Sequence, residues 1–185
     1  MERLAVAATP LPGLVVLERR VLQDARGGFS RLYGRDELDA LGVGTFDVAQ
    51  ANHSVTAHVG ALRGLHYQRD PHAERKLVHC VRGAVFDVAV DLRRGSPTFG
   101  RWHGELLSAT NGRAMLIPER WAHGFQCLEA DSEVIYLHTA AYAPDSEGGV
   151  DALDPALAVG WPLPPGERSK RDGALPRLGR DFEGL

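Results

Sequence analysis

The segment "GALRGLHYQ", Gly60 to Gln68, carries two side chains capable of chemistry within a run that is otherwise typical of a strand. Arg63 is a permanent cation whose planar set of donors matches phosphate and carboxylate groups. His66 titrates near neutral pH and acts as a general base when a carboxylate fixes its tautomer. A lone His in a β protein is more often structural, and the local pattern leaves the partner carboxylate open.

Two further polar residues lie in apolar, strand-like runs. Lys76 in "AERKLVHC" is either an edge residue that reaches solvent or a cation directed into a cavity. Tyr136 in "SEVIYLHTAAY" shares one face of an alternating strand with Val134 and His138. A buried Tyr is usually a core residue with a hydrogen-bonded hydroxyl. Each residue by itself favours the structural interpretation.

Three other kinds of side chain are equally open to interpretation. His123 in "IPERWAHGFQ" follows a turn, and Arg26 in "QDARGGFSRLY" has the donors to bind a phosphate, although a surface Arg beside Gly-Gly is the plainer reading. Cys80 and Cys127 fall in apolar runs and are spaced as neither a disulfide framework nor a zinc knuckle. We expect both thiols to be buried.

The composition limits the class of protein that must position these residues. A length of 185 residues suits one domain with a sizeable core. The net charge of -3, with acidic and basic residues interspersed, gives no basic stripe for nucleic acid, whereas a small anionic ligand is compatible. No apolar run reaches the roughly 18 residues of a membrane span, and the N-terminus lacks a signal-peptide pattern. We therefore expect a cytoplasmic protein.

The spacing of turn residues predicts an all-β fold. The 21 Gly and 11 Pro residues separate short runs rich in Val, Leu, Phe and Tyr. The clearest strand is Ala84 to Arg93, where alternation has a period of two residues. Further strands are expected at 101–108, 113–118, 123–129 and 132–142. Intervals of about 10 residues between turns favour a sandwich, barrel or jelly roll.

One short helix and an irregular tail complete the expected organisation. The segment "RDELDALG" predicts a helix with Asp36 as N-cap, Leu38 and Leu41 on one face, and Gly42 as its stop. After Pro144 the chain is too rich in Pro and charge for a regular sheet. We expect residues 144–185 to wrap over the barrel as loops and short turns, within a single domain of residues 1–185.

Several motifs taken together resemble one known family. The chain contains, in this order, "DARGGF", "AQANHSVTAHVGALRGLHYQ", "RKLVHCVRGAVFDVAVDLRRGSPTFGRW", "IPERWAHGF", "VIYLHTAAYAPDSEGGV", "DPALAVGWPL" and "SKRD". This arrangement is similar to the dTDP-4-dehydrorhamnose 3,5-epimerase family of the cupin superfamily, over roughly residues 10 to 176. The resemblance implies a jelly roll with the cupin double-stranded β-helix, a homodimer, and an isomerase without metal or cofactor that acts on a dTDP-linked 4-keto-6-deoxy sugar.

The resemblance also implies roles for individual residues. His66 matches the general base, Asp172 the carboxylate that orients it, Lys76 the cation beside the C4 oxygen, and Tyr136 the acid on the opposite face of the sugar. The positions that match the nucleotide and diphosphate pocket are Arg26, Gln50, Asn52, Arg63 and His123, and those associated with the nucleobase are Phe29 and Tyr142.

These roles agree with the chemistry of epimerisation beside a ketone. A C–H next to a carbonyl becomes acidic because the carbanion delocalises onto oxygen, so a base is needed at carbon and a positive donor at that oxygen. Inversion needs a second acid on the other face. Repeating the cycle at C3 and C5 gives a 3,5-epimerase of rhamnose biosynthesis, which supplies cell-wall polysaccharide or lipopolysaccharide; stopping after one carbon gives a single-site 3- or 5-epimerase.

Three positions depart from the family pattern. Arg31 stands where the family usually has Glu, which leaves the nucleotide preference open. Leu153 replaces an aromatic residue before "DP", and Arg120 stands where Gly is common. None of the three belongs to the implied catalytic set.

Other functions remain to be distinguished. A metal-dependent cupin oxygenase or isomerase would need a His pair, a carboxylate and a further His, whereas "LHYQ" offers only a poor set of His66, Glu74 and His123. A single-site epimerase or a 3,4-ketoisomerase would share fold and sugar nucleotide. A non-catalytic sugar-nucleotide-binding protein would not require the complete set of base, orienting carboxylate, cation and acid.

Overall fold

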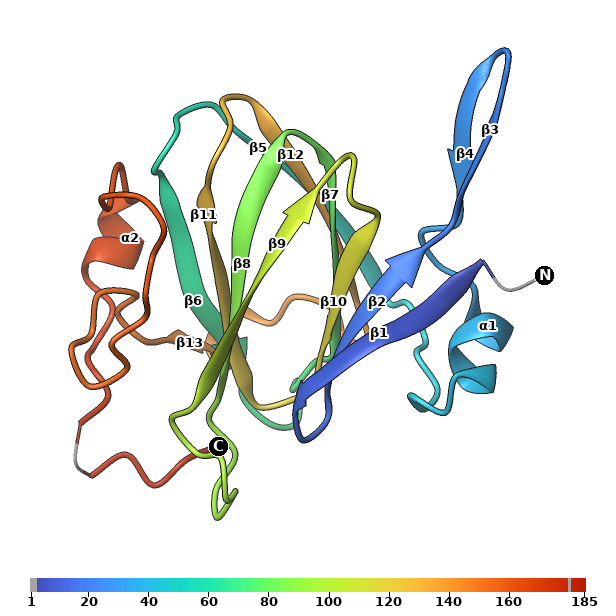
Figure 1. The fold of residues 1–185 in the computed structure, drawn as a ribbon. Helices are drawn as coiled ribbons and strands as arrows, with labels where there is room; N and C mark the ends of the chain where they lie inside the picture. The colour runs from blue at the N-terminus through green and yellow to red at the C-terminus, as the bar shows by residue number, and fades with distance from the viewer. Residues whose placement is uncertain (1–2, 180) are drawn as a thin grey trace.

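Two antiparallel sheets pack face to face in the computed structural model, which describes residues 3–179 and 181–185 (Figure 1). The six-stranded sheet has the order β1 (Leu4–Leu11), β2 (Leu14–Arg19), β10 (Arg113–Ile117), β7 (Lys76–Arg82), β12 (Ser132–His138) and β5 (Gln50–Thr56). The five-stranded sheet has the order β13 (Glu147–Gly149), β6 (Leu62–Gln68), β11 (Trp121–Cys127), β8 (Ala84–Asp91) and β9 (Trp102–Ser108). This arrangement confirms the predicted all-β jelly roll.

The predicted strands are present with small differences at their ends. β8 ends at Asp91, two residues before the expected Arg93. The cause is visible in the turn, where the Asp91 carboxylate accepts hydrogen bonds from Ser96 Oγ and Thr98 Oγ1, each at 2.6 Å. The other four expected strands correspond to β9, β10, β11 and β12.

The core between the sheets follows the alternation seen in the sequence. On β8, Val85 and Ala89 are fully buried in the cluster between the two sheets, together with Phe125. Val88 and Val90 point the other way and are also fully buried. A strand buried on both faces needs a cover on its outer side.

The C-terminal part of the chain supplies that cover. Val150, Leu157 and Trp161 belong to the same apolar cluster as Val88 and Val90, and Figure 1 shows the segment lying beside β6 and β13. Most of residues 144–185 are loops and turns, with a one-turn 3-10 helix (Pro144–Ser146) and α2 (Lys170–Gly173). The exception is β13, which pairs with β6 although the sequence predicted no sheet there.

The expected helix exists as α1 (Arg35–Ala40), but its N-cap was predicted wrongly. Gly34 is the N-cap, and Asp36 lies inside the first turn, where its negative charge favours the helix N-terminus. Leu38 is fully buried in a cluster on the outer face of the six-stranded sheet, and Leu41 packs against that cluster.

A hairpin projects from the body of the protein. Strands β3 (Val21–Asp24) and β4 (Gly27–Ser30) form a separate two-stranded sheet, which Figure 1 shows standing clear of the two main sheets. It exposes apolar side chains, with Phe29 56% exposed. An isolated two-stranded hairpin is marginal in water. Here Arg19 Nη1 on β2 donates to Ser30 Oγ on β4 at 2.8 Å, which ties the base of the hairpin to the six-stranded sheet.

Both cysteines are fully buried and unpaired, as the sequence predicted. Within residues 3–179 and 181–185, none of the helices has the length and apolar character needed to cross a membrane.

Candidate active site

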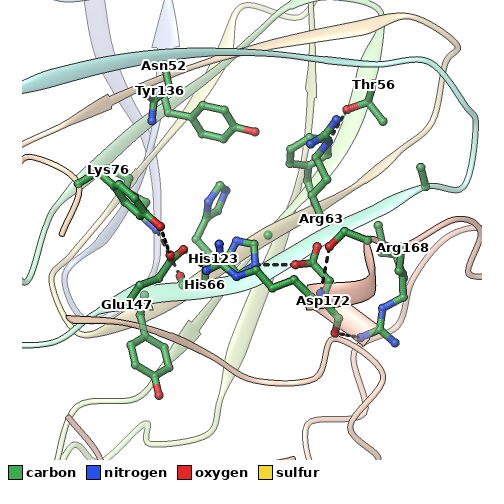
Figure 2. Close-up of a pocket in the computed structure, with 18 of the residues that line it drawn as sticks. Asn52, Thr56, Arg63, His66, Lys76, His123, Tyr136, Glu147, Arg168 and Asp172 are labelled. Atoms are coloured by element: carbon green, nitrogen blue, oxygen red, sulfur yellow. Dashed lines mark hydrogen bonds and ion pairs between the residues drawn. The ribbon is translucent and has the colours of Figure 1, made fainter. Parts of the chain in front are cut away.

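A cavity of about 680 Å³ opens between the two sheets and is bordered by the segment around α2. Its lining includes nine residues singled out from the sequence: Gln50, Asn52, Arg63, His66, Lys76, His123, Tyr136, Tyr142 and Asp172. Seven of them are labelled in Figure 2, where they converge from strands of both sheets and from the C-terminal segment: Asn52, Arg63, His66, Lys76, His123, Tyr136 and Asp172. Residues that are more than a hundred positions apart therefore share one site.

An extra residue in β6 explains how Arg63 and His66 reach the same cavity. In a regular strand, residues three apart lie on opposite faces. Opposite β11, His66 pairs with His123 and Arg63 pairs with Phe125, so three steps on β6 match two steps on β11. This β-bulge turns both side chains toward the cavity.

The bulge is built on glycine. Gly64 has a φ of 110°, a region that favours glycine, and an added Cβ would lie 2.7 Å from both Gly124 Cα and His123 O. Its amide N–H donates to Asp172 Oδ2 at 3.1 Å. The same bulge therefore shapes the strand and anchors a carboxylate from α2.

His66 and Asp172 form the pair that the resemblance implied. His66 Nε2 lies 2.8 Å from Asp172 Oδ1, and the Asp172 side chain is 6% exposed. Because a carboxylate accepts, Nε2 carries a proton, and in the neutral imidazole the lone pair is on Nδ1. Asp172 is held further by its backbone N–H, which donates to the N-cap Ser169 Oγ at 3.0 Å. The ring orientation of His66 is thus fixed by Asp172.

Opposing effects act on the Asp172 carboxyl. Burial raises its pKa, but the hydrogen bonds from His66 and from the Gly64 N–H outweigh burial and hold the pKa below the ordinary value of 3.8. Asp172 therefore stays ionised at neutral pH and places a negative charge beside the His66 ring.

Lys76 is buried inside the cavity and is not an edge residue. Its side chain is 8% exposed, and Nζ lies 3.3 Å from both Glu74 Oε1 and the backbone oxygen of His66. A buried ammonium needs such partners to remain charged. The Lys76 Nζ is therefore held inside the cavity, close to His66.

Tyr136 enters the cavity from the other sheet. It lies on β12, whereas His66 lies on β6, and Figure 2 shows its ring across the cavity from His66 and Asp172. Burial raises the pKa of the Tyr136 hydroxyl above its ordinary value of 10.0, so the hydroxyl is protonated at neutral pH. An imidazole and a protonated phenol therefore face each other across one cavity.

His123 has a buried carboxylate partner of its own. Its Nε2 lies 2.7 Å from Asp87 Oδ1, and the two side chains are 5% and 0% exposed. Burial lowers the pKa of His123, against the opposing charge of Asp87. The His123 ring also packs edge-on against Tyr136, with centroids 5.9 Å apart. His123 therefore lines the cavity and supports the tyrosine.

Part of the cavity wall, lined by Arg63, Gln50 and Asn52, offers hydrogen-bond donors for an anion. Arg63 Nε donates to Thr56 Oγ1 at 2.9 Å, which directs the guanidinium along the cavity wall. Gln50 Nε2 donates to Asn52 Oδ1 at 3.0 Å, and Tyr142 is 54% exposed at the mouth. These groups suit a ligand with a charged polar part and an aromatic part.

Arg26 and Phe29 are not in the cavity of their own chain. Both belong to the projecting β3–β4 hairpin, and neither is among the lining residues. Arg26 forms an exposed ion pair with Asp24 at 2.6 Å, and Arg3 lies over the Phe29 ring. Within one protomer, the structure therefore does not bring these two residues to the pocket, and their role at the nucleotide stays a prediction.

The sequence analysis missed several residues of the site. His138 lines the cavity and was already expected to share the face of Tyr136, so the alternation carried the signal. Glu147 and Arg171, which form an ion pair at the mouth, lie in the irregular tail and gave no periodic signal.

The three side chains considered for a metal have separate partners. His66 binds Asp172, His123 binds Asp87, and Glu74 binds both Lys76 and His138. In the part of the chain that the structure describes, three or more His, Cys, Asp or Glu side chains do not gather as a metal site.

Comparison with known proteins decides the family. Residues 8–180 match the family model described as dTDP-4-dehydrorhamnose 3,5-epimerase. The chain is 44% identical over 176 residues to the dTDP-4-dehydrorhamnose 3,5-epimerase of Salmonella typhimurium, covering 94% of each protein. The chain belongs to this family. Its members are isomerases of the cupin superfamily, so the enzyme class and the cupin-type jelly roll predicted from the sequence are confirmed.

Solved structures agree. The dTDP-4-dehydrorhamnose 3,5-epimerase from Bacillus anthracis with TDP and PPi bound has a TM-score of 0.91 and 40% identity, covering 95% of this chain and 99% of that one. A 3'-monoepimerase from Streptomyces bikiniensis in complex with dTDP-quinovose has a TM-score of 0.83 and 38% identity, covering 90% of this chain and 84% of that one.

The departures from the family pattern lie outside the cavity. Arg120 has a φ of 62°, in the left-handed region, which accounts for the glycine usual there. Its guanidinium binds Asp70 at 2.7 Å. Arg31 lies near Glu37, with Nε 3.6 Å from Oε2, and Leu153 is 39% exposed. None of the three lines the cavity in this chain.

The pairing of His66 with Asp172 predicts a measurable change in acidity. In His66→Ala, Asp172 loses the hydrogen bond and charge that oppose burial, so its pKa rises. A carboxyl group whose pKa is lowered by folding stabilises the folded state at pH values above its unfolded pKa of 3.8, and this contribution is lost as the pH falls through the folded pKa. At neutral pH the variant therefore loses part of this stability. Carbon-13 NMR of the carboxyl groups during a pH titration measures the shift. Asp91, held by Arg93 instead, serves as the internal control. An unchanged Asp172 titration would contradict the pairing.

Proposed function

We propose that the protein is an epimerase that converts dTDP-4-dehydro-6-deoxy-D-glucose to dTDP-4-dehydro-L-rhamnose by inverting C3 and C5. The observation that carries this proposal is the arrangement of an oriented base, a buried ammonium and a protonated phenol around one cavity. Membership of the family and the relatives' names support the choice of substrate.

In this proposal His66 is the base. Nδ1 removes the proton from the carbon next to the C4 ketone, and Asp172 stabilises the imidazolium that results. Electrons from the broken C–H bond move onto the C4 oxygen. Lys76 lies close enough to His66 to place its positive charge at that oxygen, and its charge stabilises the enolate. The ketone of the substrate is itself the electron sink, so no step of this mechanism runs through a metal or cofactor.

Tyr136 completes the inversion. A proton that returns from the same side as it left regenerates the starting sugar, so the acid must stand on the opposite face of the ring. Tyr136 comes from the other sheet and is protonated at neutral pH because burial raises its pKa. After it donates, the tyrosinate recovers a proton from solvent and His66 releases one, which resets the site for the second carbon.

The nucleotide end of the substrate binds, in this proposal, along the cavity wall that carries Arg63, Gln50, Asn52 and His123. Arg63 offers paired donors to a diphosphate, and the exposed ring of Tyr142 is available for a nucleobase. The Bacillus anthracis relative holds TDP and PPi, which supports a site for these groups.

We further propose a homodimer in which the hairpin of one protomer completes the site of the other. Arg26 and Phe29 lie away from their own cavity on a projecting hairpin that exposes apolar side chains. A second copy would cover the exposed apolar side chains and bring a cation and an aromatic ring to the nucleotide. We also propose that the chain works as a single domain in the cytoplasm, where nucleotide-activated sugars are made.

Single-site epimerisation is the second candidate, because a 3'-monoepimerase is similar in structure over 90% of this chain. The same base, cation and acid serve one carbon or two. What separates the outcomes is whether the sugar can present both C3 and C5 to His66.

Isotope exchange tests the proposal. The purified enzyme is incubated with dTDP-4-dehydro-6-deoxy-D-glucose in heavy water, and deuterium is followed at C3 and C5 by NMR. We expect label with inversion at both carbons, and label with loss of inversion in Tyr136→Phe. Inverted label at one carbon alone would identify the single-site epimerase. No label with the wild-type protein would contradict both.

Mixing two inactive proteins tests the dimer. His66→Ala lacks the base, and Arg26→Ala lacks the proposed contact to the partner's nucleotide. A mixed dimer contains one site with an intact His66 that receives Arg26 from the other chain, so we expect activity to return when the variants are unfolded together and refolded. If the refolded mixture has no activity although each protein is folded, the exchange of hairpins is contradicted.

A further inference from the structure

Glu74 is a buried carboxylate surrounded by donors. Its side chain is 9% exposed, and its two oxygens have different partners. Oε1 faces Lys76 Nζ at 3.3 Å. Oε2 lies 2.9 Å from His138 Nδ1 and accepts from Gln68 Nε2 at 3.3 Å. Burial raises the pKa of Glu74, but His138 and Lys76 outweigh burial and leave the pKa below its ordinary value of 4.5.

The hydrogen bonds that lead to Glu74 run in one direction. This series of hydrogen bonds starts at the backbone N–H of Tyr142, which can only donate and which donates to Gln50 Oε1 at 2.8 Å. This fixes the Gln50 amide, so its Nε2 donates to Asn52 Oδ1 at 3.0 Å. Asn52 in turn directs Nδ2 at His138 Nε2, 3.2 Å away. Each amide orientation is thus set by a backbone group.

That direction determines the proton on His138. Nε2 receives a hydrogen from Asn52 and must therefore carry the lone pair. Nδ1 faces the Glu74 carboxylate and must carry the proton. His138 is consequently neutral, with its proton on Nδ1.

A second connection passes close to the same oxygen. The backbone N–H of Ala143 donates to Gln68 Oε1 at 2.7 Å, which fixes the Gln68 amide so that Nε2 faces the backbone oxygens of His72 at 2.9 Å and Ala141 at 3.2 Å, with Glu74 Oε2 at 3.3 Å. The adjacent backbone N–H groups of Tyr142 and Ala143 thus fix the amides of Gln50 and Gln68, respectively. Glu74 is left with Oε1 directed at Lys76.

We propose that Glu74 and neutral His138 are positioning residues that hold the Lys76 ammonium where the enolate oxygen forms. The inference rests on the proposed function, since it assigns the two residues to the same reaction. Glu74 acts through Lys76, and His138 acts through Glu74. Because Gln50 and Asn52 line the cavity as well, the substrate-binding wall and the catalytic cation share one hydrogen-bond network.

The tautomer provides a test without substrate. Long-range proton–nitrogen NMR of histidine-labelled protein at neutral pH reports which ring nitrogen carries the proton, and loss of a signal in His138→Gln assigns the residue. We expect a single proton on Nδ1. In Asn52→Asp the donor to Nε2 becomes a carboxylate, so we expect both ring nitrogens of His138 to be protonated. A proton on Nε2 alone in the wild type would overturn the inference.

Kinetics test the link to Lys76. Glu74→Gln keeps the shape but removes the charge that pairs with the ammonium. We expect kcat to fall at least 10-fold with KM within twofold, because the variant loses stabilisation of the enolate more than binding. Glu133→Gln is the matched control, since Glu133 on β12 contacts His53 on β5 at 2.9 Å on the surface, away from Lys76. We expect this control variant to leave kcat and KM unchanged.

The outcomes separate the two proposals. If the wild-type enzyme turns over and folded Glu74→Gln has the same kcat, the positioning role alone is overturned. Absence of wild-type turnover would overturn the proposed function, while the NMR experiment would still report the tautomer of His138.

Discussion

The geometry of the site depends on one extra residue in β6. Regular alternation would send Arg63 and His66 to opposite faces of the sheet, and only one of them would reach the cavity. The bulge at Gly64 turns both inward, and the Gly64 N–H fixes Asp172. The close approach of Gly64 and Gly124 leaves no room for a Cβ between the strands. One backbone irregularity therefore sets the positions of Arg63, His66 and Asp172.

Around this bulge, the buried ionisable groups are paired. Asp172 lies against His66, Asp87 against His123, and Glu74 against both Lys76 and His138. An unpaired buried charge costs several kcal/mol, so this distribution lets positive and negative groups coexist in a cavity between apolar sheets. It also keeps His66, His123 and Lys76 apart, because each faces a different carboxylate.

Much of the scaffold was predictable because it follows local rules. Alternation identified β8 and placed Tyr136 and His138 on one face of β12, and turn residues indicated the all-β class. The bulge was not predictable, because a spacing of three between Arg63 and His66 looks like a regular strand. The partnership of His66 with Asp172, 106 positions apart, came only from family resemblance. The position of Arg26 and Phe29 outside their own cavity depends on a hairpin that forms a separate two-stranded sheet, which no local pattern encodes.

The most direct test of this account is the Gly64→Ala variant, measured for dTDP affinity by calorimetry and for deuterium exchange at the sugar. The matched control is Gly95→Ala, which also has a positive φ, 70°, but open space around the added Cβ. We predict that folded Gly64→Ala loses affinity and exchange together, since Arg63 and His66 move with the bulge, while Gly95→Ala keeps both. Retention of wild-type affinity and exchange in Gly64→Ala would contradict the central role of the bulge.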